Sequence, residues 1–127
     1  MYWNELDGSI LFNKVFTTNV VINEIDIFDI KIDREAATVI VSFDLINALP
    51  DNPPPKWIKD YNRCRCGINC SGVSELSLNG ISVNMLAKIK IERKDGGDYV
   101  AINGDMINLH LKCAHIQLMG PSVYIDK

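Results

Sequence analysis

The chain has 127 residues, of which 47% are hydrophobic and 23% charged. This length and composition predict one globular domain, residues 1–127, whose core needs no disulfide or metal. The longest apolar run, Tyr99–Ile102, is far shorter than the roughly twenty residues of a membrane-spanning helix. The acidic first residues also lack the basic and long apolar segments of a signal peptide, so we expect a cytoplasmic protein without a membrane partner.

The charge is unevenly distributed along the chain. The net charge is −3, but residues 1–62 carry five Lys/Arg against ten Asp/Glu, whereas residues 63–127 carry eight against six. No basic surface for a phosphate backbone is indicated, so a nucleic-acid partner is not expected. The N-terminal half favours a basic protein partner. The alternative is an ordinary solvated acidic surface.

The N-terminal residues predict a short helix. Asp7–Ser9 has the composition of a helix start, because Asp and Ser side chains can accept hydrogen bonds from the first free N–H groups. The apolar face expected for this two-turn helix consists of Ile10, Leu11, Val15 and Phe16.

A β-hairpin is predicted over residues 23–46. In its first strand Ile25 and Ile27 share one parity, whereas Ile30 and Ile32 share the other. One extra residue in the strand, a β-bulge, would return the later isoleucines to the core face. The second strand alternates regularly from Ala37 to Ile46. A stiff proline-rich loop follows, and we expect Trp57 beside it to pack on the edge of the core.

The stretch from Asn62 to Gly80 contains three of the four cysteines. Apolar and polar residues alternate from Arg63 to Ser71, which predicts a half-buried central strand with its thiols in the core. A turn at Ser71–Gly72 and a partner strand through Leu76 and Leu78 are expected to follow. The alternative is a structural zinc module that uses Cys64, Cys66, Cys70 and Cys113, or a histidine from His110 and His115.

Regularly spaced turns predict an antiparallel meander in the second half. They lie at Asn79–Gly80, Asp95–Gly97 and Asn103–Gly104. Residues Val123–Ile125 are expected to end the chain as an edge strand, through which copies of the chain could pair as a homodimer. The predicted fold class is mainly β: an antiparallel meander forming a sandwich or a partial barrel, with a short N-terminal helix.

Neither catalytic nor cofactor motifs occur in the sequence. Nucleophile-elbow, zinc-protease, phosphate-loop and dinucleotide-binding patterns are all absent, so we expect neither an enzyme nor a cofactor. Cys113 and His115 lack a third group that would orient an imidazole. The densest acidic patch supplies the predicted partner contacts, Glu24, Asp26 and Asp29, and Trp57 is added for its exposure.

Several stretches together resemble the immunity protein 50 family of bacterial polymorphic-toxin systems. They run in order over most of the chain, whereas the cysteines are not part of the pattern. The stretches are Trp3–Leu6 with Gly8–Ser9, Val41–Leu45, Asp51–Trp57, Asn62–Arg63, Gly72–Gly80, and Ile91–Arg93 before Asp95–Gly97.

This resemblance implies a small cytoplasmic protein that binds and neutralises a cognate secreted toxin, which protects the producer and its kin. The implied mechanism is stoichiometric occlusion of the toxin, without chemistry by this chain. The resemblance assigns no toxin-contact residues.

Overall fold

Eight β-strands make up most of the structure, a computed structural model that describes residues 1–127. No helix in it has the length and apolar character needed to cross a membrane. The elements are η1 (Trp3–Glu5), α1 (Ile10–Val15), β1 (Glu24–Asp33), β2 (Thr38–Leu45), β3 (Arg63–Ser71), β4 (Glu75–Asn79), β5 (Leu86–Lys94), β6 (Gly97–Gly104), β7 (Asn108–Cys113) and β8 (His115–Tyr124).

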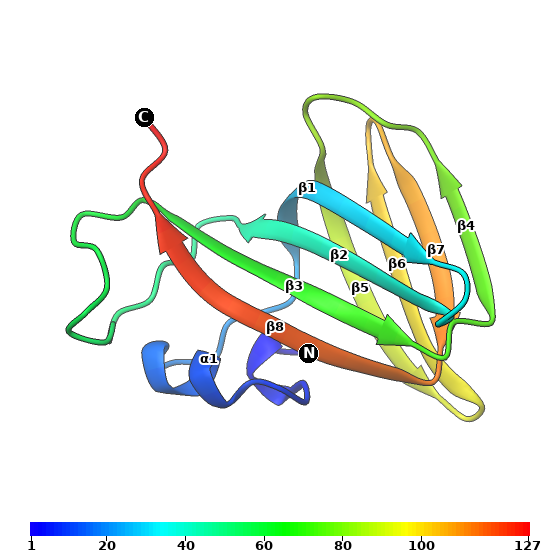
Figure 1. Ribbon diagram of the computed structural model, residues 1–127, viewed down its shortest axis with the longest axis horizontal. Helices are drawn as coiled ribbons and strands as arrows, with labels where there is room; N and C mark the ends of the chain where they lie inside the picture. Colours follow the sequence, from blue (N-terminus) through cyan, green and yellow to red (C-terminus); the bar gives the residue numbers. More distant parts are fainter.

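All strands belong to one continuous sheet in the order β4-β7-β6-β5-β1-β2-β3-β8, and every neighbouring pair is antiparallel. The sheet has two halves, joined only where Glu24, Ile25 and Asp26 of β1 pair with β5. Figure 1 shows these halves crossing steeply. The edge strands β4 and β8 do not pair with each other, so the sheet is open. The mainly β, antiparallel prediction is confirmed, with one bent sheet in place of two separate sheets.

The inner faces of the two halves enclose a cluster of 27 buried hydrophobic residues. In β3 the predicted alternation is confirmed, since Cys64, Cys66, Ile68 and Cys70 are all at most 4% exposed. The thiols therefore act as small core residues. The N-terminal segment adds Trp3, whose ring lies 5.1 Å from that of Phe43.

The predicted bulge in β1 is confirmed, because the register between β1 and β2 shifts between Ile27 and Asp29. Ile30 returns to the inner face and is half-buried against the core. The expectation for Ile32 is wrong, as this side chain is 55% exposed. The reason is that β5 leaves β1 after Asp26, so no strand of the other half covers the end of β1.

One strand pairing and one strand boundary differ from the prediction. β4 pairs with β7 and not with β3, which lies between β2 and β8. The chain passes between the halves of the sheet at Gly72 and again at Ala114, whose N–H donates to Ser71 O at 2.9 Å. The edge strand predicted at Val123–Ile125 is the end of the longer β8. This strand continues through Gly120–Pro121 because a register shift opposite β3 accommodates the extra residue.

The N-terminal helix is present, but its capping and buried face differ from the prediction. Ser9 Oγ donates to Asn4 O at 3.0 Å and makes no helix-capping bond. Ile10 is 75% exposed. The buried face consists of Phe12, Val15 and Phe16, because Phe12 stacks on Phe16 with 4.4 Å between the ring centroids.

The turn after β4 leads to a prediction about Gly80. Its φ is +95°, and a Cβ added there would lie 2.2 Å from Met106 O. Gly96 has a similar φ of +90° but no atom within 4 Å of the added Cβ. We expect Gly96→Ala to cost about 1–2 kcal/mol from backbone strain alone, and Gly80→Ala clearly more. Urea unfolding of both variants measures the difference, and equal losses would contradict the clash.

Candidate functional site

An open groove of about 810 Å³ follows the free edge of β1. After Asp26 the only further bond toward β5 is from Ile27 N–H to Met85 O at 3.2 Å, so residues 28–33 have β2 alone as a neighbouring strand. We call this hollow the β1 groove; it is lined by Asp26, Ile27, Phe28, Asp29, Ile30, Ile32, Asp44, Arg63, Arg65, Leu78, Gly80, Ile81, Ser82, Val83, Met85, Tyr124 and Asp126.

The groove carries an excess of negative charge. Four of its lining residues are aspartates and two are arginines. Both arginines already have carboxylate partners, since Arg63 lies 3.2 Å from Asp126 and Arg65 lies 3.2 Å from Asp44. The remaining carboxylates belong to Asp26 and Asp29, which the bulge brings to the same face of β1. They are available to a basic partner.

A buried carboxylate anchors the inner wall of the groove. Asp44 is 5% exposed and accepts hydrogen bonds from Arg65 Nε, at 3.2 Å, and from the Tyr124 hydroxyl. The Arg65 guanidinium lies between two rings, 3.6 Å from the centroid of Phe28 and 4.5 Å from that of Tyr124. Burial, followed by the Asp44 hydrogen bond, raises the pKa of Tyr124, so its hydroxyl stays protonated as a donor.

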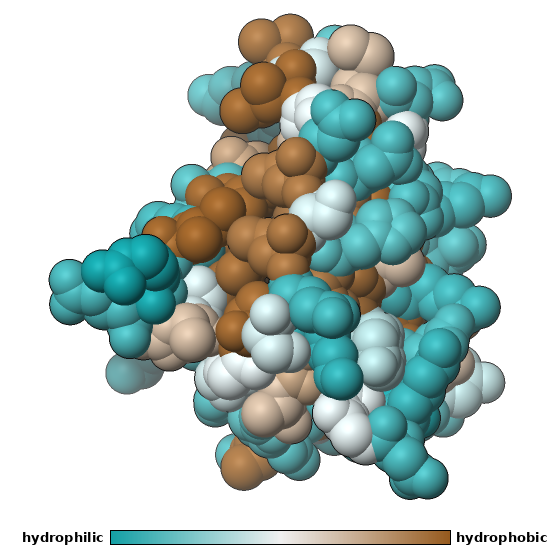
Figure 2. All heavy atoms as spheres, turned by 90° about the vertical axis from the view of Figure 1, so that its right-hand side faces the viewer, coloured by the Kyte–Doolittle hydropathy of each residue, from teal (hydrophilic) through white to brown (hydrophobic).

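The opposite side of the groove is apolar. On the loop between β4 and β5, Ile81 is 89% exposed and Val83 is 99% exposed. Leu78 of β4 adds exposed apolar surface on this side, and Phe28 and Ile32 add it on β1 itself. Figure 2 views the side of the molecule that carries β4 and shows apolar atoms in a continuous band there. Contiguous apolar surface of this kind, rimmed by charge, is typical of a protein–protein contact.

The structure brings together two of the four predicted contact residues. Asp26 and Asp29 line the β1 groove, whereas Glu24 lines a separate pocket beside Trp3. Trp57 is half-buried and packs against the core, as expected for a residue at the core edge, and it does not line the groove. The contact role of all four residues stays a prediction.

The four cysteines do not converge on a metal site. They are free, buried thiols, and the structure contains no group of three or more His, Cys, Asp or Glu side chains placed to hold a metal ion. The thiols lie as two neighbouring pairs, Cys64 with Cys66 and Cys70 with Cys113. The neighbouring thiol, followed by burial, raises the pKa of Cys66 and of Cys70. The structure therefore does not bring the four cysteines together as the zinc site considered above.

Most of the groove was not predicted from the sequence. Alternation puts Asp44 and Arg65 on the polar parity of their strands, but nothing in the pattern indicates that they pair or that Phe28 stacks on Arg65. Ile81 and Val83, two apolar residues that follow the predicted turn at Asn79–Gly80, are the one signal in the sequence for the apolar side. Their convergence with β1 depends on the strand order.

The inner wall gives a stability prediction for Tyr124→Phe. This change removes the hydroxyl that donates to the buried Asp44 and accepts from Arg65 Nη2 at 3.1 Å. A hydrogen bond to a charged group contributes about 1.5–3 kcal/mol. Tyr61→Phe is the matched control because it removes a bond to a neutral acceptor, Pro50 O at 2.6 Å, for which about 0.5–1.5 kcal/mol is expected. Urea unfolding should rank the two losses in this order, and the reverse order would refute the anchoring role of Asp44.

Comparison with known proteins gives one family. The family model described as immunity protein 50 matches residues 8–124. Neither the curated proteins nor the solved structures contain a match. The matched range includes every strand and the whole β1 groove. The chain therefore belongs to the immunity protein 50 family, and its general role is that of an immunity protein.

Proposed function

We propose that this protein neutralises a cognate bacterial toxin by binding it stoichiometrically through the β1 groove, in the cytoplasm and without chemistry of its own. The observation that carries the proposal is the combination of two carboxylates, Asp26 without a cation partner and Asp29 with only the exposed Lys31, and exposed apolar side chains along one free strand edge. Family membership supports a toxin as the partner in general. The polymorphic-toxin context rests on the resemblance described above.

The electrostatics of the groove favour a basic toxin surface. Asp26 has no cation within ion-pair distance, and the nearest cation to Asp29 is the exposed Lys31, at 3.9 Å. Complementary charge speeds diffusional encounter and fixes orientation more than it adds affinity. We therefore assign to Asp26 and Asp29 the task of steering the toxin into place.

Main-chain and apolar contacts would then hold the complex together. Residues 28–33 of β1 lack a strand on the β5 side, so a toxin segment could pair with this edge. The exposed Ile81 and Val83 would be covered by the same partner, which removes apolar surface from water. Such contacts act mainly on the dissociation rate.

A pair of charge reversals tests the steering role. We expect Asp26→Lys with Asp29→Lys to slow association with the cognate toxin domain by about tenfold or more at low salt. The toxin domain would carry an inactivating mutation, and stopped-flow or biolayer kinetics would give the rates. Glu5→Lys with Asp95→Lys changes the net charge equally at exposed positions outside the groove and should have a much smaller effect.

Two other outcomes would count against the proposal. Equal slowing by both double variants would show that only net charge matters, and the groove would lose its assigned role. If the unaltered protein and its toxin form no one-to-one complex in size-exclusion chromatography with light scattering, occlusion is not the mechanism.

A further inference from the structure

A second hollow, of about 570 Å³, lies at the other end of β1. The last pair between β1 and β2 is Ile25 with Leu45, and beyond it the two chains separate. Asn47, with φ of +58°, turns the chain away from β1. The resulting hollow lies between residues 16–24 and 45–51, and we call it the Trp3 pocket after the residue at its floor.

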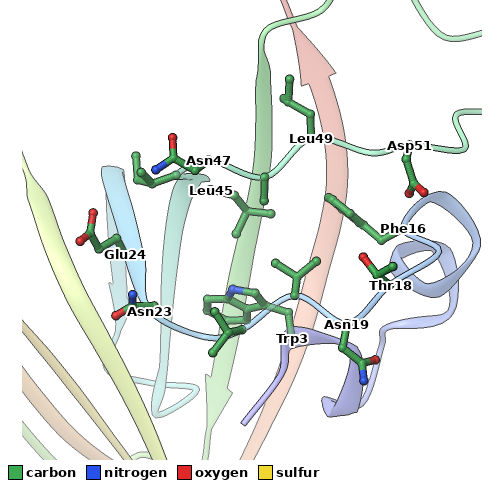
Figure 3. A pocket seen from close by; sticks show the side chains of 14 residues that line it. Trp3, Phe16, Thr18, Asn19, Asn23, Glu24, Leu45, Asn47, Leu49 and Asp51 are labelled. Carbon is green, nitrogen blue, oxygen red and sulfur yellow. The ribbon is translucent and has the colours of Figure 1, made fainter.

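The floor of this pocket contains an unpaired hydrogen-bond donor. Trp3 is 1% exposed, and none of the side-chain hydrogen bonds found in the structure involves its indole N–H. The only fully enclosed side-chain polar atom without a partner is Asn69 Oδ1, so the Trp3 nitrogen is not fully enclosed, and Trp3 lines the pocket. Figure 3 shows the indole in the middle of the pocket, with its nitrogen on the edge turned toward Leu45. Buried Trp N–H groups usually have a partner, so this one is suited to an incoming acceptor.

The charged groups of the pocket are all acidic. Glu24 and Asp51 line it, and no lysine or arginine does. Figure 3 shows these two carboxylates at opposite ends of the pocket with Trp3 between them. Asp51 accepts hydrogen bonds from the N–H and the hydroxyl of Thr17, which lower its pKa and keep it ionised at neutral pH.

These features together select a basic peptide segment. The indole donor can bond an acceptor such as a main-chain carbonyl, and the exposed carboxylates of Glu24 and Asp51 attract a cation. A pocket of 570 Å³ is large enough for a few residues of an extended chain. An acidic ligand would meet two carboxylates with no compensating cation in the lining.

We infer that the Trp3 pocket binds an arginine- or lysine-bearing loop of the toxin, with a loop carbonyl on the Trp3 N–H and the basic side chain on Glu24. This inference rests on the proposed function for the identity of the partner. Glu24 and Asp26 lie two residues apart on one face of β1, roughly 6.6 Å along the strand. One partner can therefore reach the Trp3 pocket and the β1 groove together.

Two-dimensional ¹H–¹⁵N NMR tests the pocket without the toxin. The chain has two tryptophans, and Trp57→Phe assigns the two indole N–H signals. We expect acetyl-Gly-Arg-Gly-amide to shift the Trp3 indole signal saturably and to leave the Trp57 signal in place. The neutral acetyl-Gly-Gln-Gly-amide should bind more weakly. An unmoved Trp3 signal, or equal binding of both peptides, would overturn the assignment of a basic ligand.

Matched variants identify the carboxylate that contributes. Glu24→Gln should weaken binding of the arginine peptide by about two- to fivefold, the range expected for an exposed ion pair. Glu35→Gln removes an equal charge from the exposed β1–β2 turn and should leave binding unchanged. If the two variants bind equally, Glu24 does not hold the cation.

A pocket-filling variant separates this inference from the proposed function. Ala48→Phe places a ring in the Trp3 pocket and should weaken the toxin complex about tenfold, with an unchanged circular-dichroism spectrum as the check on folding. An equally tight complex would overturn the pocket as a toxin contact and leave immunity by occlusion standing. If the unaltered protein binds no toxin, the proposed function fails, and the peptide titration alone decides whether the pocket takes a basic segment.

Discussion

The short junction between β1 and β5 determines the shape of this protein. β1 is ten residues long, but only its first three residues pair with β5. The two halves of the sheet can therefore cross steeply and enclose a core while remaining hydrogen-bonded to each other. The same short junction leaves the rest of β1 with a free edge. The bend between the two halves of the sheet and the opening of the β1 groove therefore have the same cause, the short pairing of β1 with β5.

The bulge in β1 determines which side chains line the β1 groove. One extra residue directs Phe28 onto the Arg65 guanidinium and returns Asp29 to the face that carries Asp26. Beneath Phe28, the carboxylate of Asp44 would be costly to bury alone, and its bonds to Arg65 and Tyr124 offset that cost. Because Arg65 forms its ion pair with Asp44, it does not neutralise the charges of Asp26 and Asp29. The acidity of the groove therefore follows from internal pairing, which leaves Asp26 and Asp29 without a strong cation partner.

Local patterns predicted the parts of the fold that depend on local geometry. The parity of Cys64 to Cys70 placed the thiols in the core, and the phase change after Ile27 located the bulge. The order of the strands was harder to predict from the sequence. Alternation in β4 indicates which of its residues share a face, but it does not indicate which strand pairs with β4. The pairing of β4 with β7 is decided by the crossing at Gly72, and the long β8 by a register shift opposite β3. For the same reason the groove could be predicted only through its acidic residues on β1.

The two candidate contact regions are coupled through β1. Glu24 and Asp26 both lie in the segment of β1 that pairs with β5 on one side and with or beside β2 on the other, so one short hydrogen-bonded segment borders both the Trp3 pocket and the near end of the β1 groove. A toxin that engages both would gain from this preorganisation, because little conformational entropy of the immunity protein is lost on binding. It would also need basic side chains at a matching spacing, which excludes most other basic proteins. Specificity would then arise from the geometry of two acidic sites on one strand, and affinity from the apolar loop and free edge beside them.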